Sequence, residues 1–151
     1  MSKFVKIDLS GTHLAVDTQE WAIVFDESTG LYWPKDDSGD RLDDVGEAKY
    51  IKNLNATSFG GFSDWRMPTR PELLTIVDLD KYSPAANTDF FPGTKSDWYR
   101  TCSECAWSKD KNGRASIFWL VHFHHGYVLN LHRSGNAFAR AVRGGGAPAS
   151  Q

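Results

Sequence analysis

The sequence predicts a single domain of the α+β class, and three observations carry that prediction. The chain of 151 residues is long enough to bury one core without disulfides or metal. Two stretches have helical spacing, whereas the other apolar runs are short and bounded by turn residues, as in β-strands. Six Trp, nine Phe and five Tyr, with 13 Gly and six Pro, indicate a loop-rich fold rather than a helical bundle. We expect the domain to span residues 1–145 and residues 146–151 to form a flexible tail.

The first predicted element is a β-hairpin. "WAIVF" at residues 21–25 is rich in strand-forming residues, "DESTG" at 26–30 supplies a turn, and "LYW" at 31–33 resumes the apolar pattern. "PKDDSGDRLDD", which follows, contains many carboxylates but lacks the ligand spacing of a calcium-binding loop. We therefore expect a solvated loop there.

Two helices come next. Residues 43–55 have helical spacing, and Asp43 or Asp44 can cap the N-terminus. The apolar residues that fall roughly on one face of this helix are Val45, Ala48, Tyr50, Ile51 and Leu54. A second helix begins in "PTRPELLTIVD", where Thr69 and Glu72 have the spacing of a capping box and Pro71 is tolerated in the first turn. Its expected buried side consists of Leu73, Leu74, Ile76 and Val77.

Short β-runs return after an irregular segment at residues 79–97. They are "WYRTC" (98–102), "SIFWLVHF" (116–123), "YVLNLHR" (127–133) and "FARAVRG" (138–144). Together with the first hairpin they predict a small antiparallel sheet against which the helices pack.

Charge and hydropathy exclude several classes of function. The formal net charge of −2 gives no basic excess, so we expect no nucleic-acid partner. No apolar run has the length of a signal peptide or a membrane span, so we expect no membrane insertion and a cytoplasmic chain as written. A place in a phage particle, or in a longer surface protein, is left open.

The two cysteines, Cys102 and Cys105, form a lone C-x-x-C. A disulfide between them would close only a very small loop and stabilise little. A structural zinc site would need a second pair of ligands. We therefore interpret both cysteines as plain thiols.

Four of the five histidines lie in "HFHHGYVLNLHR", at residues 122–133. We predict a hairpin with a two-residue turn at His125 and Gly126, so that His124 faces Tyr127 and His122 faces Leu129. One face then carries the apolar residues Trp119, Val121, Phe123 and Val128, and the other carries Leu120, His122, His124, Tyr127, Leu129 and Leu131. His132 falls on the first face and is interpreted as framework.

His122 and His124 would share the outer face, where a metal ion is geometrically feasible. The stretch contains no Asp, Glu or Cys to complete the coordination, so we predict no metal and no cofactor. No nucleophile with a positioned base stands out either, so we predict no catalytic residue.

Near the second helix, Asp64 and Arg66 flank Trp65 in "SDWRMPT". The two charged residues could form a functional site. The favoured interpretation is a structural latch that joins the loop to the helix.

Several stretches together resemble one family. They are "DESTGLYW", "GGFSDWRMPTRPELLTIVD", "FF" before "WYRT", and "HFHHGYV…ARAVRGG", in the family's order and spacing. On these motifs the chain is identified as a member of the DUF1566, or Lcl C-terminal domain, family over roughly residues 4–145. The resemblance implies a C-type-lectin-like fold: two helices on a small twisted antiparallel sheet, terminal strands that pair with each other, and long loops.

The family includes sugar-binding adhesin domains and the variable proteins of diversity-generating retroelements. Secreted relatives often carry cysteines that this chain lacks at Ile23 and Gly60, which fits reducing conditions. The chain also has no Glu-Pro-Asn triplet, which argues against calcium-mediated sugar binding. In the retroelement proteins the C-terminal segment varies between fixed positions. The resemblance puts the fixed positions here at Phe123, Gly126, Val128, Arg140, Val142 and Arg143.

The leading hypothesis is a non-enzymatic module that binds a macromolecular ligand, a cell-surface protein or a glycan. Its expected ligand-contact residues are Leu120, His122, His124, His125, Tyr127, Leu129, Asn130, Leu131, Ser134, Gly135, Asn136 and Ala137. One alternative is an oxidase related to formylglycine-generating enzymes, with Cys102 and Cys105 as reactive thiols. Another is a structural tip domain of a phage tail or adhesin. A homo-oligomer is left open.

Overall fold

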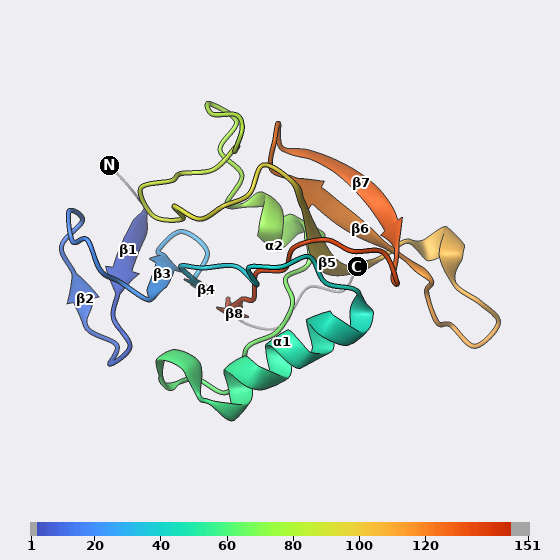
Figure 1. Cartoon of the computed structure of the whole chain (residues 1–151), viewed down its shortest axis with the longest axis horizontal. Helices are drawn as coiled ribbons and strands as arrows, with labels where there is room; N and C mark the ends of the chain where they lie inside the picture. The colour runs from blue at the N-terminus through green and yellow to red at the C-terminus, as the bar shows by residue number, and fades with distance from the viewer. Residues whose placement is uncertain (1–2, 146–151) are drawn as a thin grey trace.

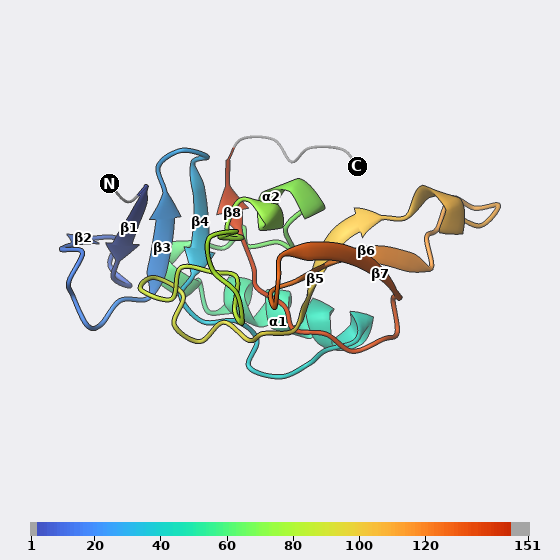
Figure 2. The same cartoon turned by 90° about the horizontal axis from the view of Figure 1, so that it is seen from above.

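Two helices and two antiparallel sheets make up the fold, which is α+β as predicted (Figure 1). The computed structural model describes residues 3–145, so the predicted tail at 146–151 lies outside the described residues. The sheets lie side by side rather than forming the one sheet expected (Figure 2). The three strands between residues 98 and 132 pair only among themselves, whereas the last strand, at residues 143–144, joins the first sheet.

The first sheet has five strands in the order β2-β1-β3-β4-β8. Its strands are β1 (Phe4–Ile7), β2 (His13–Leu14), β3 (Ile23–Asp26), β4 (Leu31–Pro34) and β8 (Arg143–Gly144). The predicted first hairpin is confirmed, since β3 and β4 pair with Asp26 opposite Leu31. Gly30 permits the tight turn between them through its φ of +74°. The sequence pattern did not predict β1 and β2.

The terminal strands do not pair with each other, which corrects that expectation. β1 pairs with β2 and β3, whereas β8 pairs with β4 at the other edge of the hairpin. In the hairpin of β3 and β4, each strand has one edge that its partner leaves unpaired. β1, from the N-terminal end, pairs with the free edge of β3, and β8, from the C-terminal end, pairs with the free edge of β4. "FARAVRG" contributes only the two residues of β8 as a strand, and Phe138 and Val142 form isolated bridges.

The second sheet has three strands in the order β5-β6-β7. They are β5 (Trp98–Glu104), β6 (Ile117–His122) and β7 (Tyr127–His132). Three of the predicted β-runs, at residues 98–102, 116–123 and 127–133, are therefore confirmed as strands, with the hairpin of β6 and β7 at one side. The outer edge of β5 meets the chain again at an isolated bridge between Tyr99 and Phe138.

The helices begin where their caps were predicted. Helix α1 (Asp44–Ala56) is capped by the Asp43 side chain, which accepts a hydrogen bond from the Gly46 N–H at 2.8 Å. Helix α2 (Arg70–Leu74) has the full capping box of Thr69 and Glu72. Two short 3₁₀ turns also occur, η1 (Phe59–Gly61) and η2 (Ala106–Ser108). The apolar face predicted for α1 is only partly buried, because Val45 remains 61% exposed.

Alternation along β3 places two hydrophobic clusters on opposite faces of the first sheet. Val24 packs with Leu73 of α2 and with Tyr99 and Val121 of the second sheet, so one core joins both sheets. Ile23 points the other way, into a cluster with Trp65 and the apolar side of α1. The main core therefore fixes the second sheet, and with it the C-terminal hairpin, against the rest of the domain.

Candidate binding surface

The C-terminal hairpin turns through four residues, Phe123 to Gly126, rather than the two predicted. His122 therefore faces Tyr127, a shift of two residues from the predicted register. Phe123 accounts for the shift, because its buried ring lies in the core and its N–H donates to the Asp97 carbonyl at 2.9 Å. Gly126 closes the turn with a φ of +85° and donates to the His122 carbonyl at 2.8 Å. Since the shift is an even number of residues, each strand side chain keeps its predicted face.

Two predicted ligand-contact residues are buried, which corrects the prediction for them. Leu120 is 3% exposed and Ala137 is 0% exposed. Leu120 lies beside Arg100 of β5, and the Arg100 guanidinium bonds to the carbonyls of residues 133 and 135. The segment after β7 therefore folds back over this part of the sheet face. Ala137 pairs with Leu42 in a short antiparallel bridge that places it in the interior.

Aromatic and imidazole rings are stacked on the remaining part of that face. The His122 ring stacks on Tyr127 with centroids 5.1 Å apart and planes 6° apart. The ring of Trp98 in β5 is nearly perpendicular to both rings, and its centroid lies 4.2 Å from that of His122 and 5.5 Å from that of Tyr127. Burial lowers the pKa of His122 below its ordinary value, although the nearby Asp97 carboxylate opposes the shift. His122 is therefore a neutral support for the exposed Tyr127 ring near neutral pH.

A loop at residues 78–85 is bound to the hairpin tip. The Ser83 N–H donates to the His124 carbonyl at 2.8 Å, and the Ala85 N–H donates to the Phe123 carbonyl at 2.6 Å. The Ser96 hydroxyl bonds to Nδ1 of His124 at 2.9 Å. These bonds connect three segments that are far apart in sequence, and Figure 1 shows the loop beside the tip of the hairpin.

The loop adds two exposed residues that the sequence reasoning missed. In the loop that is hydrogen-bonded to the hairpin tip, Leu79 is 79% exposed and Tyr82 is 75% exposed. On β7, Tyr127 and Leu129 are 44% and 45% exposed. An apolar pair in a polar loop was the available signal, but nothing in the sequence indicated its nearness to the hairpin. We call the combined set the tip surface. Its members are Leu79, Tyr82, His124, His125, Tyr127 and Leu129.

The other predicted ligand-contact residues lie along β7 and after it. Asn130, Ser134 and Asn136 are exposed, whereas Leu131 and Gly135 are half-buried. A Cβ at Gly135 would lie 2.6 Å from Cγ of Leu131, so these two residues pack closely. The structure thus places His122, Tyr127, Leu129 and Leu131 on one face of the second sheet. Asn130 lies on the opposite face, and residues 134–136 follow the end of β7 that is farther from the hairpin tip. Their role as ligand contacts stays a prediction.

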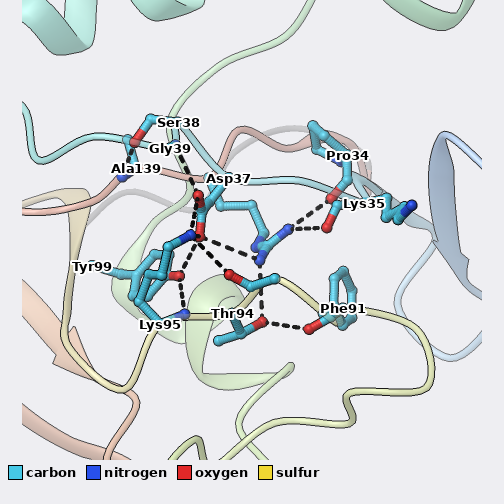
Figure 3. A network of polar contacts seen from close by, with 12 residues as sticks. Pro34, Lys35, Asp37, Ser38, Gly39, Phe91, Thr94, Lys95, Tyr99 and Ala139 are labelled. Atoms are coloured by element: carbon cyan, nitrogen blue, oxygen red, sulfur yellow. Dashed lines mark hydrogen bonds and ion pairs between the residues drawn. The ribbon is translucent and has the colours of Figure 1, made fainter.

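A buried ionic network holds the start of β5, which carries Trp98 (Figure 3). The Tyr99 hydroxyl donates to Oδ2 of Asp37 at 2.5 Å, and Lys95 Nζ lies 3.2 Å from Oδ1 of the same carboxylate. Arg140 lies 3.9 Å from Asp37 and also donates to the carbonyls of residues 34 and 35, at 2.9 and 2.7 Å. Burial raises the pKa of Tyr99, which keeps its hydroxyl protonated as a donor. The network is structural, because the side chains of Asp37, Tyr99 and Arg140 are almost fully buried.

Residues 22–143 match the model of the Lcl C-terminal domain family. The chain belongs to the Lcl C-terminal domain family. A comparison with curated proteins gives no match.

One of the stretches that carry the family resemblance, residues 60–78, contains a structural latch. Arg66 donates to both carboxylate oxygens of Glu72, at 2.7 and 2.8 Å, and to the Gly144 carbonyl at 3.2 Å. Burial acts to raise the pKa of Glu72, but Arg66 and the Thr69 N–H outweigh it, so the pKa lies below its ordinary value. Arg66 therefore joins the loop to α2 and to the C-terminal strand, as the latch interpretation expects.

The cysteines of this Lcl-family chain are both free thiols. Cys105 is buried, and Cys102 on β5 has its Sγ 3.6 Å from the Met67 carbonyl. Burial raises the pKa of both thiols, so neither is poised as a thiolate nucleophile. This environment does not favour the oxidase alternative.

Neither a metal site nor a membrane span is found in the described part of this Lcl-family domain. Among residues 3–145 no three His, Cys, Asp or Glu side chains are grouped so that they could hold a metal ion. Over the same residues no helix is both long and apolar enough to cross a membrane.

Proposed function

We propose that the chain is a non-enzymatic module that binds a macromolecular ligand, a protein or a glycan, through the tip surface. The observation that carries the proposal is the exposure of Tyr127, Leu129, Leu79 and Tyr82 at one end of the domain. Large apolar side chains gathered at one exposed site are characteristic of interaction surfaces, in which aromatic residues are enriched.

The rigidity of the supporting structure favours recognition over chance exposure. Tyr127 is stacked on His122 and braced by Trp98, and the loop that carries Tyr82 is hydrogen-bonded to the hairpin tip. Aromatic side chains held in place lose little conformational entropy when a ligand binds. A cavity of about 430 Å³ opens beside Leu79, and its lining is mixed, with Ile76 and Val77 as well as Lys3 and Asp78.

The finer parts of the proposal are a C-type-lectin-like fold and membership of a diversity-generating retroelement system. The retroelement part is supported by a difference in burial and contacts between the positions expected to be fixed and those expected to vary. The positions that the resemblance treats as fixed have structural contacts: Phe123 is buried, Gly126 closes the turn, Arg140 belongs to the ionic network and Arg143 bonds to Asp64. Most positions expected to vary are at least partly exposed, with Leu120 and Ala137 as the exceptions.

The direct test replaces the exposed apolar residues of the tip surface and measures capture. A Tyr82→Ser, Tyr127→Ser, Leu129→Ser variant is compared with the parent on a glycan array and on a panel of immobilised cell-surface ectodomains. The control carries Val16→Ser and Val45→Ser, two exposed apolar residues elsewhere in the fold, at 66% and 61%. We expect the tip variant alone to lose every specific signal, with both variants unfolding near the parent temperature. Capture that survives in the tip variant would contradict the proposal.

Diversification has a separate test. The DNA beside the coding sequence should contain a near-identical template repeat that differs only at adenines, next to a reverse transcriptase. If no such repeat is found, the retroelement part is rejected and the binding proposal stands unchanged.

A further inference from the structure

Strand β7 is an uncovered edge of the second sheet. It pairs with β6 along six residues without a bulge, from His122 opposite Tyr127 to Ile117 opposite His132. Among residues 3–145 no strand pairs with its outer side, and Figure 1 shows it at the rim of the molecule. The other edge of the sheet, at β5, is partly covered where Tyr99 bridges to Phe138.

The alternation of hydrogen-bonded and non-bonded residue pairs between β6 and β7 shows which peptide groups point outward from β7. The Arg133 N–H donates to the Ser116 carbonyl at 2.8 Å, so these two residues form a hydrogen-bonded pair. In an antiparallel ladder such pairs alternate with non-bonded ones. Tyr127, Leu129 and Leu131 therefore bond to β6, whereas the alternate residues direct their N–H and C=O groups away from the sheet. These outward residues include Val128 and Asn130.

The edge lacks the features that usually protect a strand from pairing with another chain. "YVLNLH" contains no Lys, Arg, Asp, Glu, Pro or Gly. The first sheet is different, because its two edge strands, β2 and β8, have only two residues each. Short edges of that kind offer little to a partner strand. In the described fold, β7 is the long edge left open.

We propose that β7 is a dimerisation strand, on which a second copy of the chain adds its own β7 in antiparallel orientation. The two-fold axis passes through Leu129, perpendicular to the sheet. Tyr127 then lies opposite Leu131 of the partner subunit, and Val128 lies opposite Asn130 of the partner subunit. The outward N–H and C=O groups of Val128 and Asn130 bond to each other twice, once on each side of the axis. The result is one continuous sheet of six strands.

Self-complementarity favours a second copy over an unrelated peptide. The strand carries no formal charge at neutral pH, so two copies meet without like-charge repulsion. On the exposed face the contacts are Leu129 with its own copy and Tyr127 with Leu131 of the partner subunit, all apolar or aromatic. A two-fold axis perpendicular to the sheet also leaves each side chain on its original face. Both tip surfaces then face the same side, and this bivalent arrangement, unlike the dimer itself, rests on the proposed function.

Sedimentation equilibrium of the whole chain without any ligand tests the dimer. We expect a reversible monomer–dimer equilibrium between micromolar and millimolar concentration. Asn130→Pro removes an outward N–H that β6 does not use, so it should weaken dimerisation by about tenfold or more while the monomer stays folded. Asn130→Ser, which keeps the N–H, is the matched control and should dimerise like the parent. A parent that is monomeric throughout, or a dimer that persists in Asn130→Pro, would overturn the proposal.

Amide hydrogen exchange and cross-linking test the register. Exchange at the amides of Val128 and Asn130 should slow as the concentration rises, whereas the amides of Tyr127 and Leu129 should be protected at every concentration. In a Cys102→Ser background, Leu129→Cys should form a disulfide dimer under mild oxidation, and Leu131→Cys should not. Equal cross-linking of both variants would refute the pairing. Since no ligand is present, a failure here leaves the proposed function untouched, and a failure of ligand capture leaves the dimer untouched.

Discussion

Replacing Arg100 with Met should be one of the most damaging single substitutions in the domain. The Arg100 side chain is 5% exposed and lies between three segments. It bonds to Oε1 of Glu47 in α1 at 2.8 Å, to the Leu42 carbonyl at 3.2 Å, and to the carbonyls of residues 133 and 135 at 3.0 and 2.7 Å. Met has a similar length and keeps the apolar packing, so the substitution removes the charge and the donors alone.

The expected magnitude follows from the burial of the pair. Removing one partner of a buried ion pair costs about 3–5 kcal/mol, because the other charge is left uncompensated. Domains of this kind are stable by only about 5–15 kcal/mol. At about 2–4 °C per kcal/mol for a chain of this length, the melting temperature should fall by roughly 6–20 °C. Urea unfolding gives the free energy directly, and calorimetry gives the temperature.

The loss should depend on pH through Glu47. Burial raises the pKa of Glu47 above its ordinary value even though Arg100 acts to lower it. Without Arg100 that pKa should rise further. A carboxyl whose pKa is higher in the folded state stabilises the fold at low pH and loses this contribution as pH rises through the folded pKa. The free energy of unfolding that Arg100→Met loses relative to the parent should therefore be larger at mildly alkaline than at mildly acidic pH.

Glu47→Gln provides the control for this reasoning. It keeps an acceptor for Arg100 but cannot titrate, so an Arg100→Met, Glu47→Gln double variant should lose the pH dependence. Amide exchange in residues 133–136 should quicken in Arg100→Met, because their carbonyl anchors are gone. A deficit below about 0.5 kcal/mol, the size of an ordinary surface substitution, or one that is equal at both pH values would refute the reasoning.

Two further predictions concern the hairpin. Gly126→Ala should destabilise by about 1–3 kcal/mol more than Gly61→Ala in urea unfolding. Both glycines have φ near +86°, at +85° and +86°, but only at Gly126 would the new Cβ meet a neighbour, 2.7 Å from Cγ1 of Val77. Equal costs would show that the tip does not pack against residues 77–79. His122 should titrate in NMR below its ordinary pKa, and Asp97→Asn should lower that pKa further, since the carboxylate opposes the shift. The stability that His122 contributes is present above its unfolded pKa and lost as pH falls toward the folded one, so an unchanged titration in Asp97→Asn would contradict the assigned cause.

The elements that could be predicted from the sequence depend on local chemistry. The caps of both helices involve residues no more than three apart, Asp43 with Gly46 and Thr69 with Glu72. The turn at residues 26–30 is equally local. Strand β1 lacked such a signal, since four residues give little alternation to detect. It forms because β3 provides a partner edge more than fifteen residues away.

The register of the C-terminal hairpin could not be predicted because distant residues determine it. From the sequence, His125 and Gly126 are a plausible two-residue turn between β-rich runs. Phe123 leaves the ladder for contacts outside the hairpin, with its N–H bonded to Asp97 and its carbonyl bonded to Ala85. For the same reason Leu79 and Tyr82 could not be assigned to the surface, since tertiary contacts alone bring their loop to the tip.

The division between backbone anchors and exposed side chains explains how this surface could change its sequence without losing its fold. The path of the hairpin tip is determined by the Phe123 ring in the core, the positive φ of Gly126 and main-chain bonds to the 78–85 loop. None of these contacts uses the side chains of His125, Tyr127 or Leu129. Because those three side chains are exposed, most substitutions there should change the free energy of unfolding by about 0.5 kcal/mol or less. His122 and Leu120 differ, because one supports the Tyr127 ring and the other is buried beside Arg100. If the segment is diversified, the substitutions tolerated at positions 120 and 122 should be narrower than those at 125, 127 and 129.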